Sequence, residues 1–295
     1  MKNSHSAATS APRQNRLSPE LRAFVRNPAG MAGLTLLLLV VFMALAAPVI
    51  YPDDPLDMAA QPFLWPGQDP DYPLGTDSLG RDVAAGIVHG AQVSLLIGCG
   101  SVLVSLLIGT LVGSLAGYFG GRVDDLLVHL TELFQTFPTF LLVVVLVAIG
   151  QPSVTLISSA IGIASWPTIA RLVRAEFRTL RESDFVLAAR SQGFSSLRII
   201  LQEMLPNALP SIIVTTSVMV ASSILIESAL SFLGFGDPNR VSWGSMIGAG
   251  RESLRTAWYL TTLPGCVLVL TVLSLNLVGD ALNDALNPRL RERNT

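Results

Sequence analysis

Long apolar stretches separated by polar segments dominate the sequence from residue 28 onward. Six of them are long enough to cross the roughly 30 Å apolar core of a bilayer as helices that rise about 1.5 Å per residue. They cover residues 28–50, 91–117, 126–149, 154–172, 209–233 and 258–282. The pattern predicts an all-α polytopic membrane protein with six transmembrane helices, the fourth of which is interrupted and kinked at Trp166-Pro167.

The polar segments between and around these stretches differ in character. Residues 1–27 form a polar tail that turns into a short helix from Pro19, and residues 289–295 form a second tail. Residues 51–90 alternate Pro with Asp, so we expect an ordered loop outside the membrane with little regular structure. Residues 182–207 are polar but favour helix.

Within this last segment the residues predict a helix, a turn and a second helix. Ser183 or Asp184 can cap the first helix, and Gly193 supplies the permissive backbone that ends it. The second helix restarts at Ser195 or Ser196 and is expected to stop before Pro206, because the residue preceding a proline is disfavoured in the α region.

Composition narrows the class of protein. Of 295 residues, 51% are hydrophobic and only 14% are charged, which is typical of polytopic membrane proteins rather than of soluble domains. The two cysteines, Cys99 and Cys266, lie inside apolar stretches, where small buried hydrophobes are expected. They imply neither a disulfide framework nor a metal site.

Residues 182–207 carry a family resemblance. Their A-A-x-x-x-G core, followed by an apolar helix and L-P-N, resembles the coupling loop of ATP-binding-cassette (ABC) importer permeases, so we call residues 182–207 the coupling segment. The resemblance implies that this segment docks on a separate ATPase subunit in the cytosol. Leu187 stands where that family most often has Glu, and Glu203 where His or Arg is frequent. The residues expected to couple to the ATPase are Asp184, Leu187, Ala188, Ala189, Gly193, Leu205 and Pro206.

Three further motifs resemble one branch of these permeases, the branch that imports peptides and nickel. They are P-L-G-T-D-S-L-G-R-D-V at 73–83, S-F-L-G-F-G from Ser231, and G-D-x-L-x-D-x-L-x-P-R at 279–289. Matches therefore extend over nearly the whole chain after residue 20. The resemblance implies a type I ABC importer permease fold and import of di- or oligopeptides, with nickel, opines and glutathione as open alternatives.

The resemblance also implies partners and a location. A homologous permease would complete a heterodimer, two ATPase subunits would bind ATP and Mg, and an extracytoplasmic substrate-binding protein would deliver the substrate. The chain itself would bind no cofactor, would contact membrane lipid and would bind no nucleic acid. The expected location is the bacterial inner membrane.

The second apolar stretch carries small residues at a strict four-residue spacing. Such a row lets another helix approach backbone to backbone, which is how transmembrane helices associate. The alternative is that the glycines only permit bending. The row consists of Ser101, Ser105, Gly109, Gly113 and Gly117.

Charge predicts the orientation. With six spans and a cytosolic N-terminus, fifteen of the 19 Lys and Arg residues lie on the cytosolic side, as the positive-inside rule requires. Both termini and the coupling segment are then cytoplasmic. Four arginines before that segment either form a face beside lipid headgroups or position the segment. They are Arg171, Arg174, Arg178 and Arg181.

The residues argue against an enzyme. A P-loop needs a Lys within G-x-x-x-x-G-K-[ST], and the only lysine is Lys2 in the tail. A self-contained secondary transporter or channel is the alternative function, but it would need charges inside the membrane. Glu132 and Glu227 are the only acidic residues well inside the spans. Glu227 is a candidate pore residue, or else it accepts hydrogen bonds from neighbours such as Ser223 or Ser231.

Overall fold

A computed structural model describes residues 19–286, which are mostly helical and contain no β-strand in that range. The predicted tail at 289–295 and residues 1–18 of the predicted N-terminal tail lie outside the described residues. Five helices are long and apolar enough to cross a membrane, and a bent pair, α4 with α5, makes six if it counts as one span. An all-α polytopic fold is therefore confirmed. The helices are α1 (Pro19–Val25), α2 (Pro28–Ile50), α3 (Val83–Phe119), α4 (Gly121–Thr136), α5 (Thr139–Ile149), α6 (Val154–Arg181), α7 (Asp184–Ser191), α8 (Ser196–Arg198), the π-helix η1 (Ile199–Met204), α9 (Leu205–Phe232), α10 (Trp243–Gly250), the 3₁₀ turn η2 (Arg251–Ser253) and α11 (Tyr259–Leu286).

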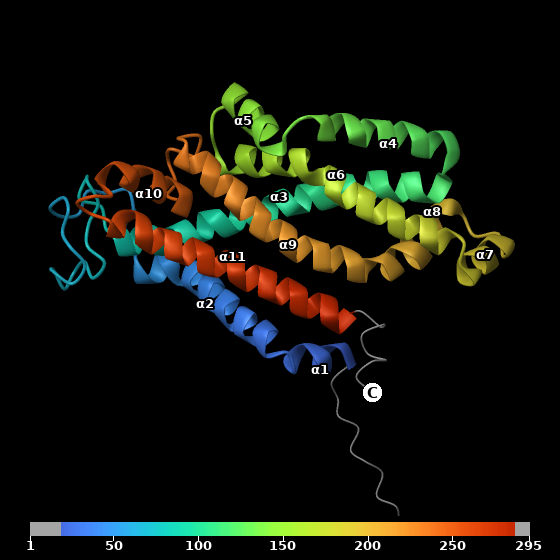
Figure 1. Ribbon diagram of the computed structural model, residues 1–295, viewed down its shortest axis with the longest axis horizontal. Coiled ribbons are helices and arrows are strands. Elements are labelled where there is room, and N and C mark those ends of the chain that lie inside the picture. The colour runs from blue at the N-terminus through green and yellow to red at the C-terminus, as the bar shows by residue number, and fades with distance from the viewer. Residues whose placement is uncertain (1–18, 287–295) are drawn as a thin grey trace, which may run out of the picture.

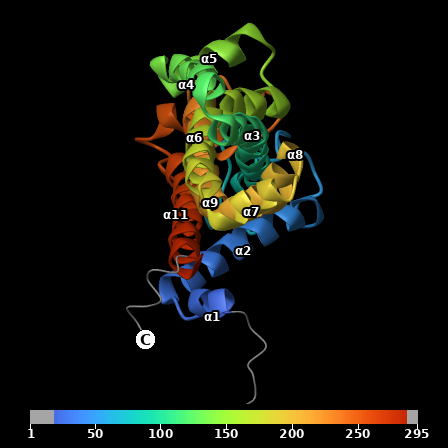
Figure 2. The same cartoon turned by 90° about the vertical axis from the view of Figure 1, so that its right-hand side faces the viewer.

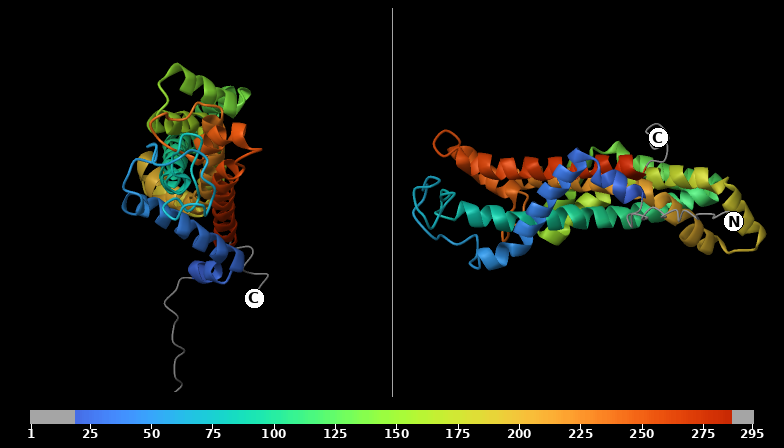
Figure 3. Two further views of the ribbon diagram at one scale, coloured as in Figure 1. Left: turned by 90° about the vertical axis from the view of Figure 1, so that its left-hand side faces the viewer. Right: turned by 90° about the horizontal axis from the view of Figure 1, so that it is seen from below.

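The long helices run side by side along the long axis of the molecule (Figure 1). α3 packs along α6 and α9, while α11 packs against α2 and α9. The irregular residues 51–82 and α10 lie together at one end, which we call the loop end (Figure 3). The coupling segment, with α7 and α8, lies at the opposite end (Figures 1 and 2). The loop end and the coupling segment, the two candidate functional regions, are therefore separated by the full length of the bundle.

Helix α3 begins eight residues earlier than predicted. Asp82 lies in extended backbone and its Oδ1 accepts a hydrogen bond from the Ala84 N–H at 2.8 Å, which caps the helix at Val83. The irregular loop consequently ends at residue 82 rather than at 90. Hydropathy located only the apolar centre of the helix, and α6 and α11 likewise run beyond the predicted 172 and 282.

The predicted third span, 126–149, is not one straight helix. α4 and α5 meet at an angle of 81° around Phe137-Pro138. Phe137 has extended backbone (φ −89°, ψ 133°), as expected for a residue that precedes proline. The α4 helix itself begins directly after a turn at Gly120, whose φ is +68°. Residues 126–149 can therefore count as one span only as a broken one that changes direction at Phe137-Pro138.

Two prolines did not act as predicted. α6 continues from Val154 to Arg181 through Pro167, so the predicted interruption is absent, while the kink at Pro167 stays a prediction. Pro206 does not end a helix either, because it lies in the first turn of α9, where no intrahelical N–H is required. The π-helix η1 joins α8 to α9, and the Leu205 N–H donates to the Ile200 carbonyl five residues back. Residues 196–232 thus form one continuous helical rod.

Candidate functional site

The coupling segment begins with α7, which turns sharply away from α6. Ser183 is extended (φ −78°, ψ 150°), and its carbonyl accepts the N–H groups of Val186 and Leu187. Its hydroxyl donates to the Leu180 carbonyl of α6 instead of capping α7. Ser183 therefore links the end of α6 to the start of the segment.

Gly193 ends α7 in a left-handed conformation, with φ +78°. Its N–H donates to the Arg190 carbonyl at 2.9 Å, and the Phe194 N–H donates to the Ala189 carbonyl at 3.1 Å. A Cβ atom at Gly193 would have no atom within 4 Å, so the requirement for glycine is conformational and not steric.

Burial divides the residues predicted for ATPase coupling. Ala189 is buried, together with Val186, in the core formed with Phe177 and Met204. By contrast Asp184, Leu187, Ala188, Gly193 and Pro206 are exposed and Leu205 is half-buried. Ala189 therefore anchors the segment, whereas the others are free to meet a partner.

Sequence reasoning missed part of this exposed surface. Three large apolar side chains are exposed beside the predicted residues: Phe185, Leu197 and Leu201. The four-residue spacing of Leu197 and Leu201, which places both on one helix face, could have indicated them.

The four arginines that precede the coupling segment do not share one environment. Arg174 forms a two-point ion pair with Asp124 of α4, with Nη2 to Oδ2 at 2.8 Å. Arg181 pairs with the neighbouring Glu182 at 3.1 Å, whereas Arg171 and Arg178 are exposed. One arginine thus ties α6 to α4, and two remain free to meet solvent or headgroups.

The row of small residues on α3 faces α6. A Cβ atom at Gly109 would lie 2.7 Å from Ile169 Cβ, and one at Gly113 would lie 2.5 Å from the Ala170 carbonyl oxygen. One at Gly117 would meet Phe177 Cβ at 2.5 Å.

The serines of the row add hydrogen bonds to this contact. The Ser105 hydroxyl donates to the Gly162 carbonyl of α6 at 2.9 Å. The Ser101 hydroxyl donates within α3, to the Gly98 carbonyl at 2.9 Å. The row therefore contacts a helix of the same chain, where only small residues fit.

Glu227 on α9 is fully buried among serines. Ser231 donates to Oε1 at 2.7 Å, while Ser94 of α3 and Ser228 each donate to Oε2 at 3.3 Å. Ser223, the other predicted neighbour, makes no hydrogen bond to it within the described residues. Glu227 also forms no ion pair there. Its carboxylate thus joins α3 to α9.

At the loop end, Thr76 organises residues 51–82. Its side chain accepts the Leu64 N–H at 3.0 Å and donates to the Gln61 carbonyl at 2.6 Å. The Tyr259 hydroxyl of α11 lies 2.8 Å from the Leu64 carbonyl oxygen and 2.9 Å from that of Thr76. These contacts fasten the loop to the start of α11.

The motif at 73–83 has a local structural cause. Gly75 and Gly80 have φ near +80°, and a Cβ on either would collide with a backbone carbonyl of the same loop. Asp77 Oδ1 accepts the N–H groups of Leu79 and Arg81 at 2.8 and 2.9 Å. Burial raises the pKa of the Asp82 carboxyl, and hydrogen bonds from the following backbone N–H groups oppose that rise.

Comparison with known proteins agrees with this architecture. Residues 109–292 match the family described as "Binding-protein-dependent transport system inner membrane component", and residues 21–72 match the N-terminal membrane domain of oligopeptide transport permease C. A solved structure of the MetNI methionine ABC transporter in an inward-facing conformation aligns with a TM-score of 0.57 at 18% identity, covering 68% of this chain and 96% of that one. This likeness shows the type I importer fold.

Curated relatives align over almost their whole length. The chain is 39% identical to the di/tripeptide transport system permease protein DppC of Pseudomonas aeruginosa, over 92% of this chain and 91% of the relative. It is 37% identical to the oligopeptide transport system permease protein OppC of Escherichia coli K12, over 92% and 90%. Together with the fold, these matches show that the chain belongs to the family of inner-membrane permease components of binding-protein-dependent ABC importers.

Proposed function

We propose that this chain forms half of the pathway by which a bacterial ABC importer carries di- or oligopeptides across the inner membrane. The relatives named above are di/tripeptide and oligopeptide permeases, which supports a peptide substrate over nickel, opines or glutathione. A homologous second permease would form the other half. Membrane lipid would contact the outer surface of the pair.

The family works with a separate ATPase and a substrate-binding protein, which a self-contained transporter does not need. Two ATPase subunits carrying ATP and Mg would dock at the coupling segment. The observation that supports this role most is the division of α7 into buried Val186 and Ala189 and exposed Asp184, Leu187 and Ala188. Such a helix is anchored in the bundle on one face and open to a partner on the other.

The same placement supports the orientation that we propose. The coupling segment lies at the end opposite to residues 51–82, so an ATPase and a binding protein would meet opposite ends of the bundle (Figure 1). With fifteen of the 19 basic residues assigned to the side of the coupling segment, that end and both termini are cytoplasmic. ATP binding would then move the coupling segment and rock the long helices between inward- and outward-facing arrangements.

Reconstitution tests this proposal. The chain, its cognate permease, ATPase and binding-protein subunits are assembled in vesicles, and uptake of radiolabelled dialanine is measured with and without ATP. ATP-dependent uptake that requires every subunit is expected. Uptake of nickel but not of dialanine would contradict the peptide substrate, and uptake without the ATPase would contradict the coupling role.

A further inference from the structure

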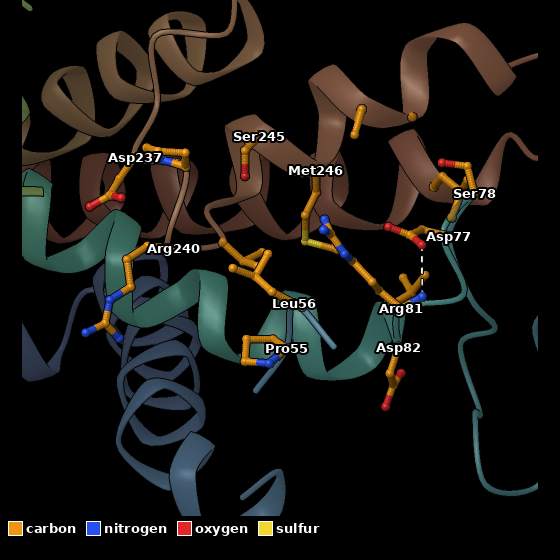
Figure 4. Close-up of a pocket in the computed structure, with 17 residues that line it drawn as sticks. Pro55, Leu56, Asp77, Ser78, Arg81, Asp82, Asp237, Arg240, Ser245 and Met246 are labelled. Atoms are coloured by element: carbon orange, nitrogen blue, oxygen red, sulfur yellow. Dashed lines mark hydrogen bonds between the residues drawn. The ribbon is translucent and has the colours of Figure 1, made fainter. Parts of the chain in front are cut away.

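A cavity of about 240 Å³ opens at the loop end, away from the coupling segment and from the small-residue row. Its walls come from residues 51–82, from the start of α3, from the α9–α10 connection and from α10 (Figure 4). Apolar atoms of Leu56, Val83, Met246 and Leu260 contribute to the lining. Segments distant in sequence therefore converge on one small site.

Arg81 enters this cavity without a counter-ion. Its side chain extends toward Met246 (Figure 4), and its Nε is buried with no hydrogen-bond partner. Within residues 19–286 neither Arg81 nor Arg240, which also lines the cavity, forms an ion pair. Arg81 as a whole is half-buried, so the cost falls on its Nε, which burial removes from water without supplying an acceptor.

The carboxylates around the cavity are engaged with backbone groups instead. Asp77 accepts the N–H groups of Leu79 and Arg81 through Oδ1. Asp237 accepts the N–H groups of Asn239 at 2.9 Å and Val154 at 3.2 Å. Asp82 caps α3 and points away from Arg81 in Figure 4. They fix the local backbone and leave the Arg81 guanidinium available to an anion.

We propose, on the basis of the peptide-import function above, that this cavity binds the carboxyl-terminal residue of a peptide, with its carboxylate on Arg81. A guanidinium binds a carboxylate through two parallel hydrogen bonds, which suits a free peptide terminus. Three Asp carboxylates line the cavity beside its two arginines, which disfavours a polyanion. The volume is below the roughly 300 Å³ at which pockets begin to hold drug-sized ligands, so it suits one residue and its carboxylate, with the rest of the peptide outside.

Equilibrium dialysis tests this site directly. Radiolabelled dialanine is dialysed against the detergent-purified complex of both permeases and both ATPases, without binding protein, and unlabelled dialanine competes against dialaninamide. The carboxamide lacks the anionic group and is expected to compete at least tenfold more weakly. No dialanine binding, or equal competition by both compounds, would overturn the proposal.

Variants assign the effect to Arg81. Arg81→Gln is expected to weaken dialanine binding at least tenfold, in line with the loss of a charge-assisted pair. Arg255→Gln, the same change at an exposed residue outside the cavity lining, should leave binding unchanged. Because Arg81 Nε makes no hydrogen bond that the change could remove, Arg81→Gln should not lower the melting temperature. Unchanged dialanine binding in Arg81→Gln would overturn the site.

A further experiment distinguishes the two possible sources of the carboxylate on Arg81, which are a peptide and the binding protein. The affinity of the binding protein for the complex is measured for wild type and Arg81→Gln. Equal affinities, with weakened dialanine binding, support the proposal. Weakened docking with unchanged dialanine binding would instead place an acidic side chain of the binding protein on Arg81. Wild-type uptake of dialanine, measured separately, shows whether peptide import itself holds.

Discussion

The Arg174 guanidinium of α6 donates two hydrogen bonds to the Asp124 carboxylate of α4. This ion pair links α4, the first half of the bent α4–α5 pair, to the bundle. Both side chains are less than one-third exposed, which limits screening by solvent. Asp124→Asn should lower stability by about 1 kcal/mol, measured as a lower melting temperature of the purified complex. Glu182→Gln, at the largely exposed pair with Arg181, is the control and should change it less. Equal decreases in melting temperature for the two variants would show that the Arg174–Asp124 pair stabilises the complex no more than the exposed Arg181–Glu182 pair.

The close contact between α3 and α6 predicts that a large side chain at Gly113 will destabilise the protein. Gly113→Leu would drive a side chain into the Ala170 backbone, which cannot move aside as a flexible side chain can. We expect a loss of about 3 kcal/mol and poor yield of assembled complex. Gly265→Leu on α11 is the matched control, since a Cβ there meets nothing within 4 Å. Wild-type stability of Gly113→Leu would contradict the packing described above.

The left-handed turn at Gly193 predicts a conformational effect on coupling. Gly193→Val should cost about 1–2 kcal/mol at that turn and reduce both ATPase binding and uptake, with membrane insertion intact. Gly193→Asn, which tolerates positive φ better, should retain most of both activities. The measurements are co-purification of the ATPase and dialanine uptake. Wild-type behaviour of Gly193→Val would mean that the turn plays no part in docking.

The hydrogen bonds from Ser94, Ser228 and Ser231 to Glu227 predict that this residue has a structural role. Glu227→Gln keeps one acceptor oxygen for Ser231 or Ser94, and its amide N–H can donate to the other serine hydroxyl, so uptake of charged and of neutral peptides should remain near wild type. Glu227→Leu leaves those hydroxyls without an acceptor and should cost about 1–3 kcal/mol of stability. Uptake kinetics and melting temperature are compared for the two variants. A selective loss of uptake for one peptide charge class in Glu227→Gln would instead support a pore role.

Hydropathy predicted the existence of the long helices well, because burial in lipid depends on length and apolarity alone. It did not predict directions or ends, which depend on single backbone groups. The 81° bend at Phe137-Pro138 and the early start of α3 at Asp82 both arise from local signals that the sequence does contain. The continuation through Pro206 could not be predicted in this way, because it depends on a π-turn stabilised by packing of Ile200 and Met204.

The sequence likewise predicted the location of the candidate sites but not the roles of their individual residues. Motif resemblance located the coupling segment and the 73–83 loop, but burial assigned the individual roles. Ala189 proved to be a core residue although its neighbour Ala188 is exposed. Arg81 became notable only when its lack of a partner was visible in three dimensions.

Cross-linking tests the central claim, that the coupling segment meets the ATPase, most directly. Cys99 and Cys266 were expected to be buried, but both are exposed, so they are replaced by serine. Single cysteines are then introduced by Leu187→Cys on α7 and by Met58→Cys, an exposed residue at the loop end. The complex is treated with a short bifunctional reagent in the presence and absence of ATP. We expect the Leu187→Cys variant to cross-link to the ATPase with a yield that changes with ATP, and the Met58→Cys variant to give no such product. Cross-linking of the ATPase from Met58→Cys, or none from Leu187→Cys, would contradict the account.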